Sequence, residues 1–257
     1  MSTIIVKLLM IYSSNQKHST YIDFMLNSMS DKQGNIMTNK EKQALAPSVS
    51  VKFIEPEDIH VAASLLFQAY RADPLLIEIL NEPNSSKYDA KLRALVRQEL
   101  TRFGKSGQPI LGIYTENNLV AVACAFASHC EIEKSFGWHW RLTLMMGAGV
   151  LQTQQIIDKE RTIKAQLRDL GEYYFLSFIA VDPHYQGSGY GHYLLNALDS
   201  LVLENDFMSG MAVFVTQGNQ VNFFEAHGYQ LVKDITFNSV SGDLLFKART
   251  DDLEKAL

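Results

Sequence analysis

The sequence has 257 residues, of which 47% are hydrophobic and 20% are charged. This length and composition exclude a disordered, collagen-like or fibrous chain, and they predict one large domain or one ordinary domain with an extension. The formal net charge is −5, from 23 basic and 28 acidic side chains. Such a balance argues against a general nucleic-acid or anionic-membrane surface. We therefore expect a small-molecule or protein partner, with no nucleic acid and no membrane.

The longest apolar stretches, residues 142–151 and 175–181, are far shorter than the roughly 20 residues with which a helix crosses a bilayer. Residues 4–12 are apolar but are interrupted by a lysine and lack a cleavage site downstream, so we expect a cytoplasmic protein. The two cysteines, Cys124 and Cys130, lack the spacing of a metal or redox motif. Neither a disulfide nor a metal site is expected.

Residues 1–50 are polar and show no sustained period, which predicts a poorly ordered N-terminal extension before a domain over residues 51–257. Apolar and polar side chains alternate over residues 51–55, which predicts a β-strand. Pro56 then begins a helix, whose apolar side chains keep helical spacing as far as Tyr70.

An Asp-Pro pair at residues 73–74 ends this pattern, and a second helix is predicted from about Ser86 to Gly104. Two helices are thus expected before the central strands. Residues 110–115 and 119–128 are rich in β-forming side chains and predict an antiparallel hairpin.

Residues 129–151 form an irregular stretch rich in aromatic side chains and methionine, which we interpret as a lid or as core. Helical spacing returns over residues 156–170. The second half of the sequence predicts an α/β unit that ends in a hairpin. Its predicted elements are a strand at 173–181, a glycine-rich turn, a helix at 190–203, a strand at 211–215, a short helix at 221–227, and strands at 230–237 and 244–249.

The glycine-rich turn at residues 186–191 follows an apolar strand and precedes an amphipathic helix. Such a turn presents consecutive backbone N–H groups at a helix N-terminus, where the helix dipole adds about half a positive charge. Glycines at 187, 189 and 191 lack the Cβ atoms that would keep a diphosphate away. The turn therefore predicts a site for phosphate oxygens, and the alternative is a tight connection without a ligand.

Two other phosphate-binding patterns fit less well. A dinucleotide fingerprint requires Gly-x-Gly-x-x-Gly in repeated βαβ units, whereas this turn is Gly-x-Gly-x-Gly near the end of the chain. A nucleotide P-loop requires Gly-x-x-x-x-Gly-Lys-Ser. The one Gly-Lys-Ser, residues 104–106, follows a helix and has Glu99 in place of the first glycine. We interpret residues 104–106 as a helix C-cap.

The strand and turn resemble the GNAT superfamily of acetyl-CoA-dependent N-acetyltransferases, through the pattern Gln/Arg-x-x-Gly-x-Gly/Ala. Three residues match this pattern: Gln186, Gly189 and Gly191. Residues 219–229, Asn-Gln-Val-Asn-Phe-Phe-Glu-Ala-His-Gly-Tyr, are similar to that superfamily's Asn-x-x-x-Phe-Tyr-Glu-x-x-Gly-Phe element. The Tyr-Tyr-Phe-Leu start of the strand, the late Gly-Tyr and the terminal hairpin also resemble the subgroup that contains puromycin N-acetyltransferase. The resemblance covers residues 51–249 and is specific over residues 173–229.

The resemblance implies an α/β fold with a mixed, mostly antiparallel sheet of about seven strands, flanked by helices. In it, two parallel strands, here 173–181 and 211–215, splay apart around acetyl-CoA. An amine then attacks the thioester directly, while a backbone N–H polarises the thioester carbonyl. The cofactor contacts that the resemblance implies are Ile179, Ala180, Val181, Gln186, Gly187, Ser188, Gly189, Tyr190, Gly191, His192, Asn219 and Phe224.

Two residues depart from the pattern of the family. Phe224 stands where many members carry a tyrosine that protonates the departing thiolate, so this general acid is missing. Ser177 stands where some relatives carry a glutamate that draws a proton from the amine, and serine cannot act as that base unaided. Ser177 and Tyr174 are the candidate catalytic residues, and the base is left open. Other candidates for the base are Tyr173, Asp182, His129 and His139.

The resemblance therefore implies an acyltransferase that moves an acetyl group from acetyl-CoA to a primary amine of a small molecule, with peptide or protein amines as the second choice. The absence of the tyrosine leaves an alternative, a non-catalytic acyl-CoA-binding or regulatory module. Substrate choice is expected in the first two helices and in residues 129–170. A monomer or homodimer is expected.

Overall fold

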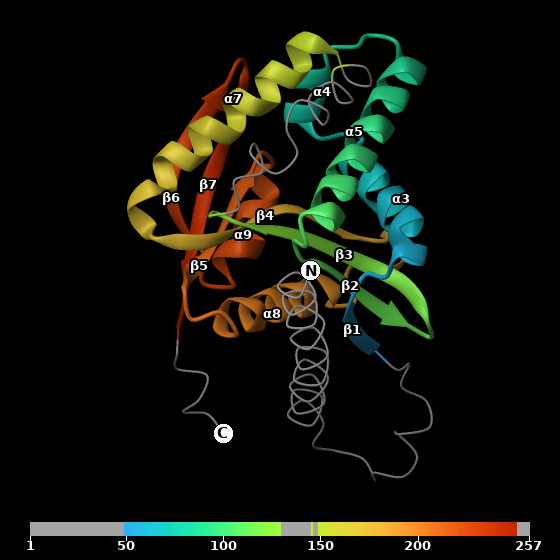
Figure 1. Cartoon of the computed structure of the whole chain (residues 1–257). Helices are drawn as coiled ribbons and strands as arrows, with labels where there is room; N and C mark the ends of the chain where they lie inside the picture. Colours follow the sequence, from blue (N-terminus) through green and yellow to red (C-terminus); the bar gives the residue numbers. More distant parts are fainter. Residues whose placement is uncertain (1–48, 130–144, 146–148, 251–257) are drawn as a thin grey trace, which may run out of the picture.

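Seven strands form one mixed sheet at the centre of the described chain (Figure 1). The structure is a computed structural model that describes residues 49–129, 145 and 149–250. The strands are β1 (Val49–Phe53), β2 (Ile110–Thr115), β3 (Asn118–Ala127), β4 (Glu172–Val181), β5 (Met208–Val215), β6 (Gln230–Phe237) and β7 (Val240–Ala248). Their order in the sheet is β1-β2-β3-β4-β5-β7-β6. Every neighbouring pair is antiparallel except β4 and β5, which are parallel.

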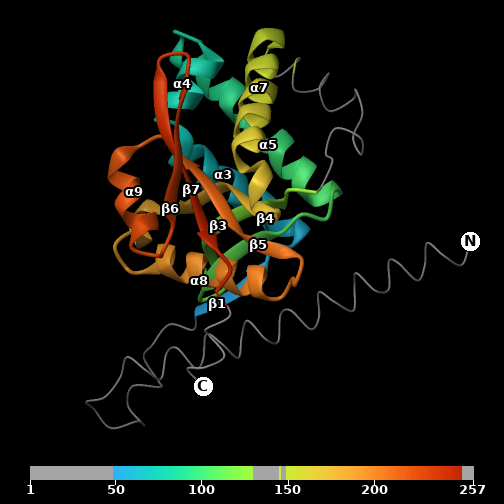
Figure 2. The same cartoon turned by 90° about the vertical axis from the view of Figure 1, so that its left-hand side faces the viewer.

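Helices cover both faces of this sheet. The α-helices are α3 (Ile59–Tyr70), α4 (Pro74–Leu80), α5 (Ser85–Lys105), α7 (Val150–Leu167), α8 (Tyr190–Leu203) and α9 (Gly218–Glu225), and the short 3-10 helices are η2 (Pro56–Asp58), η3 (Arg168–Leu170) and η4 (Pro183–Tyr185). Helices α3, α4, α5 and α7 lie on one face, and α8 crosses the other (Figures 1 and 2). Each face buries its own apolar core, built around Leu92 and Leu100 on the first face and Leu194 and Leu195 on the second.

The expectation of two helices before the central strands is wrong, because the Asp73-Pro74 pair begins a helix as well as ending one. Asp73 has extended backbone angles, and its Oδ1 accepts a hydrogen bond from the N–H of Leu76 at 2.9 Å. Pro74 occupies the first turn of α4, where a missing N–H costs nothing. Helix α4 ends at Asn81, whose φ of 40° is left-handed. A third helix therefore lies between α3 and α5.

The predicted mixed fold with about seven strands and one parallel pair is confirmed. Some predicted boundaries are too short: β5 begins at Met208 rather than 211, and β7 begins at Val240 rather than 244. The β6–β7 turn is tight, with Asn238 at a φ of 52°, so pairing extends to Phe237 and Val240. The interpretation of residues 104–106 is confirmed, because Ser106 is the C-cap of α5.

One extra residue in β4 ends the parallel pairing with β5. Towards β3, Phe178 lies opposite Cys124 and Leu176 lies opposite Ala125, which leaves Ser177 without a partner. Towards β5, the last pair is Leu176 with Val213. A bulge of this kind bends its strand and interrupts the ladder. Beyond the bulge β4 continues along β3 and β5 continues along β7, so the two parallel strands separate.

Of the predicted N-terminal extension, residues 1–48 lie outside the described residues, and Val49 and Ser50 are instead the first residues of β1. Cys130 and His139 also lie outside them, whereas Cys124 is fully buried in β3. Within the described ranges, every helix is too short or too polar to cross a membrane.

Candidate active site

The turn at residues 186–191 presents open backbone at the N-terminus of α8. Gly187 and Gly189 have φ angles of 76° and 87°, which side chains rarely adopt, and a Cβ at either would find no atom within 4 Å. Gly189 is the N-cap of α8, and no side chain caps this helix within the described residues. The first N–H groups of α8 are therefore available to an anion.

Side chains at the end of β4 hold this turn in place. Gln186 Nε2 donates a hydrogen bond to the carbonyl oxygen of Val181 at 3.0 Å. Asp182 Oδ1 accepts the backbone N–H of His184 at 2.8 Å, which lowers the pKa of this carboxyl group. Asp182, a candidate base from the sequence, thus caps the short helix η4.

A cavity of about 580 Å³, here called the turn cavity, lies along the end of β4, the turn and the start of α9. Of the twelve predicted cofactor contacts, all except Ser188 line it. The lining residues that were predicted are Ile179, Ala180, Val181, Gln186, Gly187, Gly189, Tyr190, Gly191, His192, Asn219 and Phe224. The structure therefore gathers residues from both motifs, about 30 positions apart in the chain, around one cavity.

Phe224 lies on α9 and belongs both to the core and to the wall of the turn cavity. It is 3% exposed, and its ring packs edge-on against Tyr229 with ring centres 5.3 Å apart. His192 is exposed, and its Nδ1 lies 2.9 Å from Nε2 of His227. Burial lowers the pKa of His227, and the neighbouring His192 lowers it further.

A second cavity of about 120 Å³, here called the inner cavity, lies among α4, α5, α7 and the central strands. Most of its wall is apolar, with side chains that include Leu75, Leu76, Ile79, Leu95, Phe126, Ile156 and Phe175. Three residues line both cavities: Tyr70, Asp73 and Ile179. The two cavities therefore meet where β4 and β5 separate.

Tyr70 and Asp73 connect the helices to the two strands at this junction. The Tyr70 hydroxyl accepts the N–H of Ile179 at 3.1 Å and lies 3.5 Å from the Ile179 carbonyl oxygen, to which it donates. Burial raises the pKa of Tyr70 far above its usual value, so this hydroxyl keeps its proton. Asp73 Oδ2 accepts the hydroxyl of Thr216, which follows β5, at 2.7 Å.

Charged side chains also line the inner cavity. Arg102 Nη2 lies 2.5 Å from Glu99 Oε2, and Arg102 Nη1 lies 3.1 Å from Glu160 Oε1. Burial raises the pKa of Glu99 to about 7, even though the charge of Arg102 opposes this shift. Burial lowers the pKa of Lys159, against the attraction of nearby acidic groups. The cavity thus combines an apolar wall with two ionisable groups of altered proton affinity.

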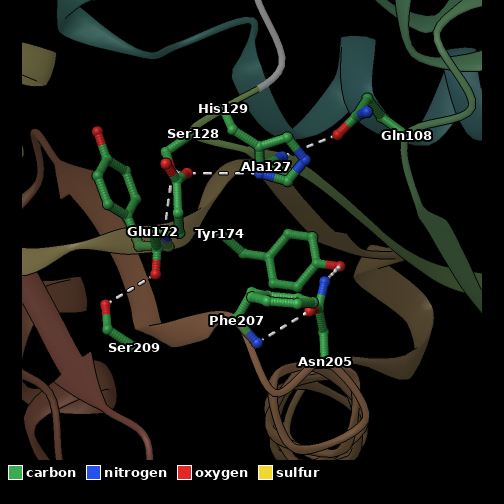
Figure 3. Close-up of polar contacts among 10 residues, drawn as sticks. Gln108, Ala127, Ser128, His129, Glu172, Tyr174, Asn205, Phe207 and Ser209 are labelled. Carbon is green, nitrogen blue, oxygen red and sulfur yellow. Dashed lines mark hydrogen bonds and ion pairs between the residues drawn. The ribbon is translucent and has the colours of Figure 1, made fainter.

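The two candidate catalytic residues lie on opposite faces of the sheet. Ser177 lines the inner cavity from the bulge of β4. Tyr174 faces α8 instead, where its hydroxyl accepts a long hydrogen bond of 3.4 Å from Asn205 Nδ2 (Figure 3). The structure therefore brings Ser177 to the junction region but not Tyr174.

Two other candidate bases, His129 just after β3 and Tyr173 at the beginning of β4, lie away from the turn. His129 Nδ1 lies 3.4 Å from Glu172 Oε2, and the same carboxylate accepts the hydroxyl of Ser128 at 2.5 Å (Figure 3). Tyr173 is buried in the first core, and burial raises its pKa to about 12. Neither lines the turn cavity or the inner cavity.

The polar residues of the inner cavity and the role of Tyr70 were not predicted from the sequence. For Glu99 and Arg102 a signal exists, because they continue the apolar face of α5 that carries Leu92 and Leu95 at spacings of three and four residues. A charged side chain at such a core position is buried at a cost, and it is therefore a candidate functional group.

Comparisons with known proteins agree with this geometry. A family model described as an acetyltransferase (GNAT) domain matches residues 152–231, which run from α7 into β6. A comparison with curated proteins found no match.

Among solved structures, this chain is similar to a histone acetyltransferase HPA2 and related acetyltransferase from Corynebacterium glutamicum, with a TM-score of 0.59 and 16% identity over 79% of this chain and 97% of that one. A mosquito arylalkylamine N-acetyltransferase like 5b has a TM-score of 0.54 and 15% identity, over 78% and 100% of the two chains. An agmatine N-acetyltransferase variant has a TM-score of 0.51 and 14% identity, over 78% and 99%. At these identities the likeness is one of fold, and the chain has the GNAT fold.

Removal of the Tyr70 hydroxyl tests whether its hydrogen bond to Ile179 stabilises the junction between the two cavities. Tyr70→Phe leaves the partly buried N–H of Ile179 without its partner, which should lower the free energy of unfolding by about 1–2 kcal/mol. The matched control is Tyr174→Phe, which removes only a 3.4 Å hydrogen bond and should cost less than about 0.5 kcal/mol. Urea unfolding of the three proteins measures both values. Equal losses would contradict a special role for the Tyr70 hydroxyl.

Proposed function

We propose that this protein is an N-acetyltransferase that moves the acetyl group of acetyl-CoA to a primary amine of a small molecule. The observation that carries the proposal is the meeting of the turn cavity and the inner cavity at Ile179, where β4 and β5 separate. The GNAT fold and the family match over residues 152–231 support acyl transfer. The names of two similar proteins, an arylalkylamine and an agmatine N-acetyltransferase, support a small amine as acceptor.

The turn cavity fits the diphosphate of coenzyme A. Gly187 and Gly189 leave open space where a Cβ would stand, and the N-terminus of α8 has no capping side chain. Phosphate oxygens can therefore approach the first N–H groups of α8, where the helix dipole favours negative charge. Asn219 and Phe224 would bound the same cofactor from α9.

The separated edge of β4 fits the pantetheine arm. Beyond Ser177, residues 178–181 are paired with β3 but not with β5, so their other backbone groups can pair with an extended amide chain. Acetyl-CoA, when bound, supplies an activated acyl group as a thioester. The N–H of Ile179 would donate to the acyl carbonyl oxygen and polarise it, provided that the Tyr70 hydroxyl releases this N–H.

The acceptor would enter the inner cavity and meet the acyl group at the junction. The apolar wall of the inner cavity and its volume of about 120 Å³ favour a small molecule as the acceptor. A peptide or protein amine is the second choice. Ser177 lines this cavity and would orient the amine, because its hydroxyl can donate and accept hydrogen bonds. No covalent intermediate on the protein is required.

A second candidate function is a non-catalytic acyl-CoA-binding or regulatory module. Phe224 favours it, because this side chain lines the turn cavity and has no hydroxyl with which to protonate a thiolate. In the enzyme, the missing acid is tolerable, since a thiol with a pKa near 8.5 leaves fairly well as a thiolate.

The same proposal includes three further points. The protein would belong to the subgroup that contains puromycin N-acetyltransferase, would be cytoplasmic, and would be a monomer or homodimer. They rest on the sequence alone.

A pair of substitutions at Gly189 tests the position of the diphosphate. Both Gly189→Ala and Gly189→Glu strain a φ of 87°, but only glutamate adds a carboxylate that repels phosphate. Wild-type protein should be stabilised by roughly 2.7 kcal/mol when CoA is present at a hundredfold excess over its Kd. In thermal unfolding, Gly189→Ala should keep most of this shift and Gly189→Glu should lose it. Equal shifts in both variants would mean that the phosphates bind elsewhere.

Turnover separates the two candidate functions. With acetyl-CoA and a panel of primary amines, the enzyme releases free CoA thiol only when an amine is present, whereas a binding module releases none with any amine. Phe224→Tyr should raise kcat by about tenfold, because it supplies a general acid at the cavity wall. Phe207→Tyr, at a side chain that is 84% exposed, is the control and should leave kcat unchanged. A thiol assay measures all three proteins, and a Phe224→Tyr rate equal to wild type would show that no acid is missing.

A further inference from the structure

The inner cavity contains a buried carboxylate that the mechanism above does not use. Glu99 is 5% exposed and lines this cavity from α5. Its Oε2 is held by Arg102, whereas its Oε1 is buried and has no hydrogen-bond partner within the described residues. A buried carboxylate oxygen without a partner is costly, so a ligand that donates a hydrogen bond would relieve this cost.

The groups around Glu99 come from several elements. The charged and titratable side chains that face it or share its cavity are Arg102 of α5, Lys159, Glu160 and Lys164 of α7, Cys124 of β3, Tyr70 at the end of α3 and Asp73 at the start of α4. Arg102 also holds Glu160, so its positive charge is divided between two carboxylates. Glu99 is therefore only partly neutralised by its neighbour.

Glu99 lies close to the part of β4 where the proposed chemistry takes place. Cys124 of β3 lies opposite Phe178, directly beyond the bulge at Ser177. Burial raises the pKa of the Cys124 thiol, and the charge of Glu99 raises it further. Glu99, Ser177 and Ile179 all line the inner cavity.

We propose that Glu99 accepts a proton from the acceptor amine, and that the acceptor is an alkyl primary amine that enters the inner cavity as an ammonium ion. This inference rests on the proposed function. The ammonium gives one proton to Glu99 Oε1, and the neutral nitrogen then forms the N–C bond as the C–S bond breaks. The second nitrogen proton ends on the departing sulfur, and Glu99 returns its proton to water.

The chemistry of the cavity fits this class of acceptor. An alkyl ammonium combines an apolar body with a cationic head, as the cavity combines an apolar wall with an unpartnered carboxylate oxygen. A weakly basic aryl amine is already neutral and would not need such a base. The raised pKa of Glu99, about 7, suits a group that must both take a proton and release it near neutral pH.

The pH dependence of kcat/KM tests the proposal, with hexylamine as the probe acceptor. In wild type, kcat/KM should rise with pH up to about 7 and then level off, because Glu99 must be ionised. In Glu99→Gln only the neutral amine reacts, so the deficit should be at least about 100-fold near pH 7 and should shrink by about tenfold per pH unit above it.

The matched control is Glu160→Gln, which removes the other carboxylate bound to Arg102. Removing the charge of Glu160 lowers the pKa of Glu99, so any deficit of this variant should be constant only above about pH 7, where Glu99 is ionised in both proteins. A Glu99→Gln deficit that is likewise constant with pH would show a structural role for Glu99 and would overturn the proposal.

The pH dependence of the melting temperature is a readout that does not depend on turnover. The pKa of Glu99 is raised in the folded state, so its stabilising contribution is present at acidic pH and is lost as pH rises through about 7. The melting temperature of wild type relative to Glu99→Gln should therefore fall between about pH 5 and pH 8. A constant difference would overturn the proposal.

If wild type releases no CoA with any amine, the proposed function fails. Binding of hexylamine in the absence of acetyl-CoA then tests whether Glu99 contacts the ammonium group. Thermal stabilisation by hexylamine that Glu99→Gln abolishes and Glu160→Gln retains supports the contact between ammonium and carboxylate. No stabilisation, or equal stabilisation of wild type and Glu99→Gln, overturns it.

Discussion

Beyond Leu176 and Val213, β4 and β5 are no longer paired with each other, and the proposed site depends on this separation. One extra residue, Ser177, ends the parallel ladder, and each strand then follows its other neighbour. Backbone groups near a protein interior need partners, and at Ile179 the Tyr70 hydroxyl provides them. A ligand that pairs with this edge must replace that hydroxyl, so the same separation would create both the proposed cofactor position and the junction with the inner cavity.

The inner cavity contains buried charged side chains that stability alone would not favour. Arg102 is 3% exposed and Glu99 is 5% exposed, and one oxygen of Glu99 has no partner within the described residues. Replacing such a buried ionic group by apolar side chains is often neutral or stabilising. A cluster of this kind in the wall of the inner cavity is what the proposed proton transfer would require.

The sequence predicted the features that depend on local chemistry. The strand, glycine turn and helix around residues 186–191 could be predicted because each is determined by residues that are adjacent in the sequence. The turn lines a cavity, as expected. It did not predict that Tyr70 reaches Ile179, 109 positions away, because this contact depends on the packing of α3 against β4. The bulge at Ser177 likewise depends on the register with β3. Helix α4 was missed because Asp-Pro was interpreted only as a terminator, although the same pair is a good helix start.

Amide hydrogen exchange with and without CoA tests the central claim most directly. CoA should slow exchange at Ile179, Val181 and residues 187–191, because their N–H groups would pair with the pantetheine arm and the diphosphate. Exchange in β2, on the far side of β3, should not change. Binding of CoA that leaves exchange at both segments unaltered, or that slows it elsewhere instead, would contradict the account.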